Sequence, residues 1–199
     1  MRRYKHNGSA IRTNIRNTGM VFENCINAVN NIYFAKGLGL IKKQNTPFIP
    51  LRDRTGKVVD VKVADKAIAD YAGVYGRYAV AFEAKSCSSD KFELSRLKSH
   101  QLETLAYYTK LGHIAFLFLS FSEQDFYILP YEVISAVITK KTDSIQWGNI
   151  TQPVSRYKHI KKSEIDDFFK INIRNSKNGI SFLDYMVAVG RIYSLEISD

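Results

Sequence analysis

Apolar residues recur at helical spacing near the start of the chain and predict a helix over about residues 18–36. Gly37 supplies a stop signal for that helix, and residues 38–43 are expected to form a short strand. The apolar face of the helix consists of Phe22, Cys25, Ile26, Val29, Ile32 and Tyr33.

Alternation with a period of two predicts a two-stranded ribbon over residues 48–63, with a turn at residues 53–56. In its second arm, Val59, Val61 and Val63 alternate with Asp60 and Lys62. One face is therefore apolar and the other charged, which suits a projecting or edge hairpin.

The remaining pattern predicts a mixed α/β order. Residues 70–75 and 78–85 read as a hairpin around Gly76 and Arg77, because glycine at the first position of a two-residue loop matches a type II′ turn. Helices are expected at 91–111, 130–139, 163–170 and 181–193, and buried strands at 114–121 and 126–129. We therefore expect one α/β domain over residues 17–199 with a mixed central sheet flanked by helices.

Composition fits a compact globular domain, with 45% hydrophobic and 24% charged residues among 199. The longest apolar run, residues 114–121, is far below the roughly 20 residues of a membrane-spanning helix. Residues 1–17 lack the apolar stretch of a secretory signal. Cys25 and Cys87 form no CxxC motif, which favours two buried thiols in a reducing compartment over a disulfide or zinc site. We expect a cytoplasmic protein.

The net charge of +10 favours a polyanionic partner, with nucleic acid ahead of an anionic membrane surface. The excess is concentrated at residues 1–16, which include Arg2 and Arg3 and are expected to form a flexible basic arm. A solvated, solubilising tail explains the same charges.

The hairpin carries the candidate chemistry. With Tyr75 opposite Tyr78, the register places Asp70 opposite Glu83, and Lys85 points to the same face. Two opposed carboxylates can converge on one divalent cation, and Mg²⁺ would relieve their repulsion. The set is typical of metal-assisted phosphodiester hydrolysis, with Lys85 orienting the attacking water or stabilising developing charge. A structural ion pair at a sheet edge fits the same residues.

The acid-x-Lys pattern also occurs at residues 60–62. There Asp60 and Lys62 lie on the polar side of the ribbon with no opposed carboxylate, so we interpret them as charged side chains exposed to solvent.

Asp70 followed after a hairpin by Glu83-Ala84-Lys85 resembles the PD-(D/E)xK nuclease superfamily. A longer set of residues resembles the RecU Holliday junction resolvases over about residues 17–130. That set consists of Asn17-Thr18-Gly19, Phe22-Glu23, Ile26, Asn30, Lys43, Thr46-Pro47, Asp70-Tyr71-Ala72-Gly73, Phe82-Glu83-Ala84-Lys85 and His100-Gln101.

The resemblance implies a restriction-endonuclease-like core and a homodimeric, Mg²⁺-dependent endonuclease that cuts four-way DNA junctions, with Mn²⁺ as a possible substitute. It implies a catalytic core of Asp70, Glu83 and Lys85, with the Ala84 carbonyl as a further metal ligand. Glu23 matches a family carboxylate that completes the acidic site, although an exposed charge beside the helix's apolar face explains it too. Gln101 matches a glutamine near the attacking water in related nucleases, and helix packing explains it equally.

In the family, the ribbon forms a stalk that enters the junction, which places residues 48–66 there. The DNA-contacting residues expected on this stalk and on the basic arm are Arg52, Arg54, Lys57, Lys62, Lys66, Arg2 and Arg3. The chain departs from the family in Ala67-Ile68-Ala69, which replaces a Ser/Thr-rich lead-in, and in a short stalk.

Two rival functions remain. One is another structure-specific or restriction-like nuclease with the same core, and the other is a non-catalytic junction-binding protein. The expected setting is the nucleoid of a cell, with a phage-encoded origin as a further option.

Overall fold

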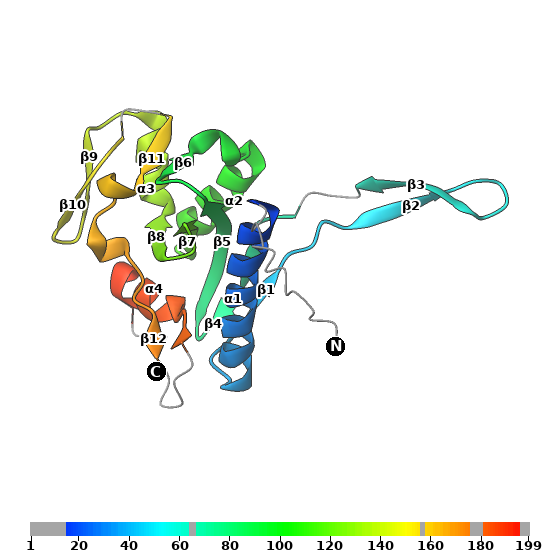
Figure 1. The fold of residues 1–199 in the computed structure, drawn as a ribbon, viewed down its shortest axis with the longest axis horizontal. Helices are drawn as coiled ribbons and strands as arrows, with labels where there is room; N and C mark the ends of the chain where they lie inside the picture. The colour runs from blue at the N-terminus through cyan, green and yellow to red at the C-terminus, as the bar shows by residue number, and fades with distance from the viewer. Residues whose placement is uncertain (1–14, 64–66, 156–157, 176–180, 196–199) are drawn as a thin grey trace, which may run out of the picture.

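The computed structural model describes residues 15–63, 67–155, 158–175 and 181–195. Its centre is a five-stranded sheet in the order β1-β4-β5-β7-β8 (Figure 1). Only β5 and β7 are parallel, so the sheet is mixed, and the expected α/β class is confirmed. The strands are β1 (Gly39–Lys43), β4 (Tyr71–Tyr75), β5 (Tyr78–Cys87), β7 (Ile114–Phe121) and β8 (Asp125–Pro130).

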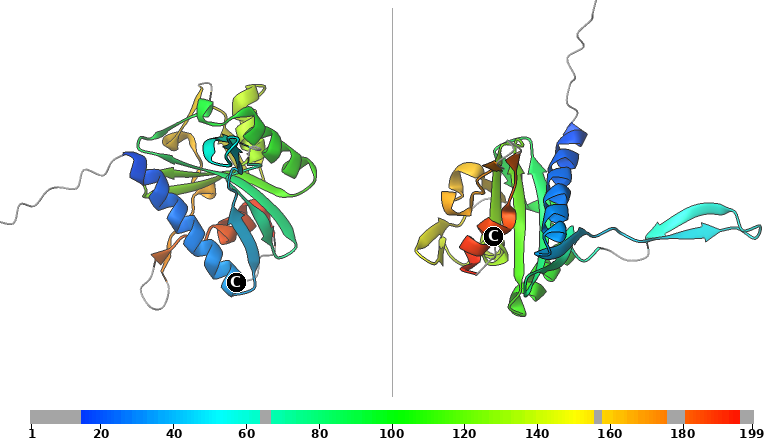
Figure 2. Two further views of the ribbon diagram at one scale, coloured as in Figure 1. Left: turned by 90° about the vertical axis from the view of Figure 1, so that its right-hand side faces the viewer. Right: turned by 90° about the horizontal axis from the view of Figure 1, so that it is seen from below.

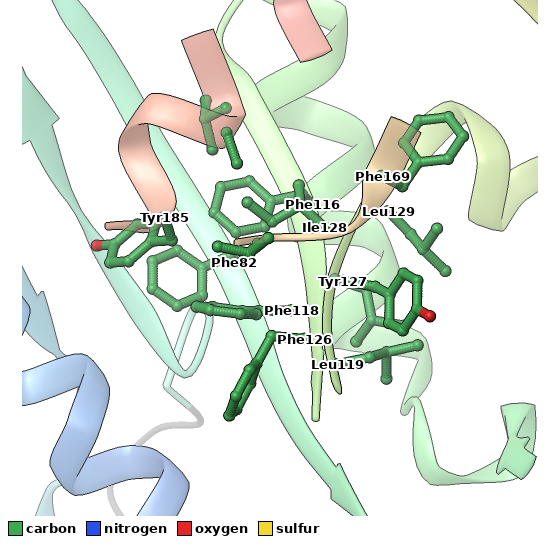
Figure 3. Packing of buried hydrophobic residues seen from close by; sticks show 14 of the residues in the cluster. Phe82, Phe116, Phe118, Leu119, Phe126, Tyr127, Ile128, Leu129, Phe169 and Tyr185 are labelled. Carbon is green, nitrogen blue, oxygen red and sulfur yellow. The ribbon is translucent and has the colours of Figure 1, made fainter. Parts of the chain in front are cut away.

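One face of the sheet is covered by the long helix α1 (Ile15–Ala35), which the right-hand view of Figure 2 shows lying along the strands. The Phe82 ring stacks between those of Tyr71 and Phe116, with centroids 4.9 and 4.7 Å apart. Tyr185, at the start of α4 (Tyr185–Tyr193), packs against Phe82 and Phe118 in the same layer (Figure 3). This aromatic layer fixes the hairpin that carries the candidate chemistry.

The opposite face is covered by α2 (Ser99–Lys110) and α3 (Tyr131–Thr139). Successive side chains of a strand point to opposite faces, so Glu83 faces away from the layer that contains Phe82. Gln101 of α2 bonds to Glu83, which places α2 on that second face. Leu105 of α2 is fully buried there.

The predicted ribbon is confirmed as β2 (Phe48–Arg52) paired with β3 (Val58–Val63), and it projects from the body of the domain (Figures 1 and 2). Pro50 pairs with Val61 and Ile49 with Lys62. One face is apolar as expected, but the other mixes apolar and charged residues. The exposed large apolar residues of both arms are Phe48, Ile49, Leu51, Val58, Val59 and Val61.

The helix predicted at 91–111 begins only at Ser99. Residues before it form β6 (Lys91–Glu93) and a 3₁₀ turn, η1 (Leu94–Arg96). β6 pairs with β11 (His159–Lys161), which sets Phe92 opposite Ile160, and both are buried. This pairing between distant segments overrides the helical spacing of the local sequence.

The prediction of a helix at 163–170 is wrong, because the chain forms two 3₁₀ turns there, η2 (Lys162–Glu164) and η3 (Asp167–Phe169). The Gln152 side chain accepts from the Asp166 amide at 2.9 Å and donates to the Glu164 carbonyl at 2.7 Å. Those bonds take backbone groups that a continuous helix would use. Gln152 belongs to an unpredicted hairpin of β9 (Ser144–Trp147) and β10 (Ile150–Pro153).

Three smaller expectations also change. The last helix starts at Tyr185 rather than 181, since β12 (Arg174–Asn175) pairs with β13 (Ser181–Phe182) ahead of it. Cys25 is exposed, whereas Cys87 is buried as expected. The basic arm ends earlier than residue 16, because α1 begins at Ile15. Within the described ranges, no helix is long and apolar enough to cross a membrane.

Candidate active site

The β4–β5 hairpin has the predicted register, from Tyr75 opposite Tyr78 to Tyr71 opposite Phe82. Asp70 directly precedes β4 and therefore faces Glu83. The Asp70 amide donates to Glu83 Oε1 at 3.1 Å, and the Ala84 amide donates to Asp70 Oδ2 at 3.1 Å. These reciprocal bonds hold the two carboxylates side by side at the end of the hairpin.

Lys85 joins the two carboxylates. Its Nζ lies 2.6 Å from Asp70 Oδ2 and 2.8 Å from Glu83 Oε2. The Glu83 side chain is fully buried, and that of Lys85 is only 14% exposed. The three side chains that the sequence grouped on one face are thus brought into direct contact.

Gln101 completes the polar contacts of Glu83. Its Nε2 donates to Glu83 Oε2, and its Oε1 accepts from the Lys98 amide at 3.0 Å. The Lys98 bond anchors the side chain at the start of α2, so Gln101 holds in place the same Glu83 oxygen that Lys85 contacts.

Burial controls the protonation of this group. Desolvation raises the pKa of Glu83 to about 7; Lys85 opposes this rise and the Asp70 carboxylate adds to it. Burial alone lowers the pKa of Lys85, but the Glu83 and Asp70 carboxylates outweigh it and raise the pKa above its ordinary value. With both acids ionised, the cluster keeps an excess negative charge in a desolvated position.

The donor set fits a hard divalent cation. Asp70 Oδ2 and Glu83 Oε2 both lie within 2.8 Å of one atom, the Lys85 nitrogen, so the two oxygens converge on a common point. Mg²⁺ in proteins is often held by one or two carboxylates, with water completing its shell. The buried charge of Glu83 gives such an ion a favourable place to bind.

Glu23 lies on α1 and forms an ion pair with Lys43 of β1, in which Lys43 Nζ lies 2.6 Å from Glu23 Oε2. It lines the same cavity as Ala84 and Lys85. Across the described ranges, however, no three His, Cys, Asp or Glu side chains gather as a metal cluster, so Glu23 is not drawn in beside Asp70 and Glu83. Its role as a ligand stays a prediction, as does that of the Ala84 carbonyl.

The cavity that Lys85 lines has a volume of about 480 Å³. Lys91 and Arg96 also line it and were not among the predicted site residues. Both lie in the segment for which a helix was predicted, where the chain instead forms β6 and η1; Lys91 is paired in β6, and Arg96 lies over the ring of Phe92 in that strand. No local sequence signal reports that pairing.

The predicted DNA-contacting residues are divided between the stalk and segments that lie outside the described residues. The side chains of Arg52, Arg54, Lys57 and Lys62 are exposed on the projecting hairpin. Arg52 donates to the Gly56 carbonyl at 2.8 Å, which braces the turn. Lys66, Arg2 and Arg3 lie outside the described residues.

Comparison with known proteins places the chain in a family. The family model RecU, recombination protein U, matches residues 17–186. The Holliday junction resolvase RecU of Streptococcus pneumoniae strain Taiwan19F-14 is 35% identical over 130 residues, which cover 61% of this chain and 65% of that protein. The same protein from strain Hungary19A-6 is 34% identical over 125 residues, covering 59% and 63%.

The matched regions therefore span less than two thirds of the relatives' own length. A solved structure of Archaeoglobus fulgidus Hjc, titled a Holliday junction resolvase from an archaeal hyperthermophile, gives a TM-score of 0.42 at 13% identity, covering 86% of this chain and 95% of that one. The family model alone covers most of the chain, and this protein belongs to the RecU family.

Proposed function

We propose that this protein is a metal-dependent endonuclease that cuts four-way DNA junctions by hydrolysing phosphodiester bonds. The observation that most directly supports this proposal is the contact of Lys85 with both Asp70 and Glu83. Lys85 also lines a cavity large enough for a segment of DNA backbone. Membership of the RecU family and the resolvase names of the pneumococcal relatives support the choice of substrate.

Asp70 and Glu83 would hold Mg²⁺, with Mn²⁺ as a substitute and with the Ala84 carbonyl and Glu23 as further ligands. The chemistry that such an ion would supply is polarisation of the phosphoryl oxygen and a lower pKa for a bound water. Lys85 orients the attacking water or stabilises the charge that develops on the phosphate, because its ammonium already lies between the two carboxylates. Gln101 keeps Glu83 in position.

The projecting hairpin supports a branched substrate. It carries Arg52, Arg54, Lys57 and Lys62 on an arm that extends away from the sheet, where each can meet phosphates of strands that diverge from the cut site (Figure 1). Lys66 and the basic arm would add further contacts. The net charge of +10 suits the high phosphate density of a junction.

A homodimer is part of the proposal, since a two-fold enzyme can place two sites on a nearly two-fold junction. The cytoplasm, at the nucleoid, is the corresponding location.

The experiment is cleavage of a labelled mobile four-way junction by the full chain, with Mg²⁺, with Mn²⁺ and with EDTA. A flap substrate and a linear duplex of the same sequence are run in parallel, and Glu83→Ala serves as the site variant. Paired, symmetric nicks that need metal, spare the duplex and disappear in Glu83→Ala support the proposal. Cutting of all substrates would indicate a general nuclease, and tight binding without cutting would indicate a non-catalytic junction-binding protein.

A further inference from the structure

We infer that the cavity beside Lys85 binds one backbone phosphate of the cleaved strand, next to the phosphate that is attacked, and that Arg96 and Lys91 hold it. The inference rests on the proposed endonuclease function and adds a second anchoring point for the same strand. The cavity lies between the first turns of α1 and the end of β5 with the chain that follows it, which meet at one end of the domain (Figure 1).

Arg96 is held in place without a carboxylate. Its guanidinium lies over the ring of the fully buried Phe92, 5.4 Å from the centroid. One nitrogen, Nη1, donates to Cys87 Sγ at 3.5 Å, and a thiol sulfur is a weak acceptor. The side chain is therefore positioned while most of its five donors remain available for an anion.

Ion pairing separates these two cations from the others around the site. Lys43 and Lys85 each contact a carboxylate at 2.6 Å. Within the part of the chain that the structure describes, neither Arg96 nor Lys91 forms an ion pair, although both line the cavity. Two unpaired cations on one wall attract a negatively charged group.

The rest of the lining suits a phosphate. Ser88 and Ser89 belong to the same β5–β6 segment and line the cavity, and their hydroxyls are of a type that donates to phosphate oxygens. The Ser89 hydroxyl donates to the Lys91 carbonyl at 3.5 Å in the protein alone. On the helix side, Gly19 presents no side chain, and a Cβ added there would meet nothing within 4 Å. Phe22 and Glu23 also line the cavity on the α1 side, and the β5–β6 side contributes one carboxylate, Glu93, beside the two cations and the serines.

The position of Lys85 fixes which phosphate is bound. Lys85 contacts both core carboxylates and also lines the cavity, so a strand attacked beside Lys85 has its neighbouring phosphate at the cavity wall. Glu23, on the opposite wall, is neutralised by Lys43. Lys91 and Arg96 outnumber Glu93, the carboxylate that lines the cavity on their side, so this side has a net positive charge and is the place for the second phosphate.

The test combines protein variants with a neutral substitution in the DNA. Arg96→Ala and Lys91→Ala are compared with Lys110→Ala, which removes the same charge from the exposed end of α2. Junctions carry a single methylphosphonate at each position flanking the cut. Binding is measured in EDTA over a range of salt, and cleavage is measured in Mg²⁺ at single turnover.

We expect Arg96→Ala to weaken binding and cleavage about tenfold and Lys91→Ala by a smaller factor. The salt slope should fall by about 0.9 for each lost phosphate contact, a change that a merely structural role would not produce. One methylphosphonate should slow the wild type about tenfold yet have little effect on Arg96→Ala. Arg96→Lys should recover part of the loss, and Lys110→Ala should match the wild type.

Two results would overturn the inference. One is a methylphosphonate effect that is equally large in Arg96→Ala and in the wild type at every position. The other is binding and cleavage by Arg96→Ala that match those of Lys110→Ala. Either result, with a wild type that cuts junctions, leaves the proposed function standing. A wild type that binds without cutting refutes that function and the inference with it, because no strand is then cleaved. A wild type that neither binds nor cuts junctions refutes both the proposed function and the inference.

Discussion

Lys85 Nζ lies 2.8 Å from Oε2 of the fully buried Glu83, so a cation already occupies the side of this carboxylate that faces Asp70. A buried acid that loses its only cationic contact keeps its desolvation cost without compensation. The relationship ties the stability of the metal-free protein to the side chains proposed for catalysis.

Lys85→Ala should therefore destabilise the metal-free protein by about 3 kcal/mol at pH 8 and abolish cleavage. The free energy of unfolding is measured by urea denaturation in EDTA, and activity by junction cleavage. Mg²⁺ should recover part of the lost stability, because it replaces the missing positive charge.

Lys43→Ala is the matched control, since it breaks the ion pair with Glu23, in which both side chains are more than a third exposed. It should cost less than about 1 kcal/mol. Equal losses in the two variants would show that burial of the Glu83 carboxylate is not the cause.

Stability of the metal-free protein should depend on pH through Glu83. Burial raises its pKa to about 7 from an ordinary value of 4.5, so its contribution to stability is full below about pH 4.5 and is lost as the pH rises through 7. Urea denaturation in EDTA from pH 4.5 to pH 8.5 measures the trend, with Glu83→Ala as reference. The wild type should lose stability relative to Glu83→Ala over this range, and parallel curves would contradict the assignment.

Gln101→Ala should lower cleavage about 10- to 100-fold and raise the Mg²⁺ concentration needed for half-maximal rate. Its side chain bonds to both Glu83 and the Lys98 amide, so its loss leaves the carboxylate less well positioned. Glu103→Ala, an exposed position on the same helix, is the control. A Gln101→Ala enzyme with an unchanged metal requirement would assign the residue to helix packing.

Local signals in the sequence were sufficient to predict the β4–β5 hairpin that carries the site. A two-residue loop at Gly76 and Arg77 sets the register of β4 and β5, and that register alone brings Asp70 opposite Glu83. The projecting ribbon followed from alternation and a turn in the same way.

Distant contacts were not visible in the sequence. Phe92 pairs with Ile160, and the Gln152 side chain takes backbone groups of Glu164 and Asp166, so two expected helices are replaced by strands and 3₁₀ turns. The position of Arg96 at the cavity depends on the first of these contacts, which is why spacing along the chain did not reveal it.

Gly73→Ala should destabilise the domain by about 3 kcal/mol, because a Cβ at this position would lie 2.0 Å from the Leu40 carbonyl oxygen and 2.7 Å from the Ile41 Cα. Both atoms belong to the backbone of β1, so the strand itself would have to shift. Thermal unfolding followed by circular dichroism measures the loss.

Gly19→Ala provides the comparison, since an added Cβ there meets nothing within 4 Å and the position is inside α1. It should raise stability by about 0.5–1 kcal/mol, as alanine does in place of glycine in a helix. If Gly73→Ala melted as high as Gly19→Ala, β1 would be free to move away from β4. In that case the position of Lys43, and with it the pairing that neutralises Glu23, would not be fixed by the sheet.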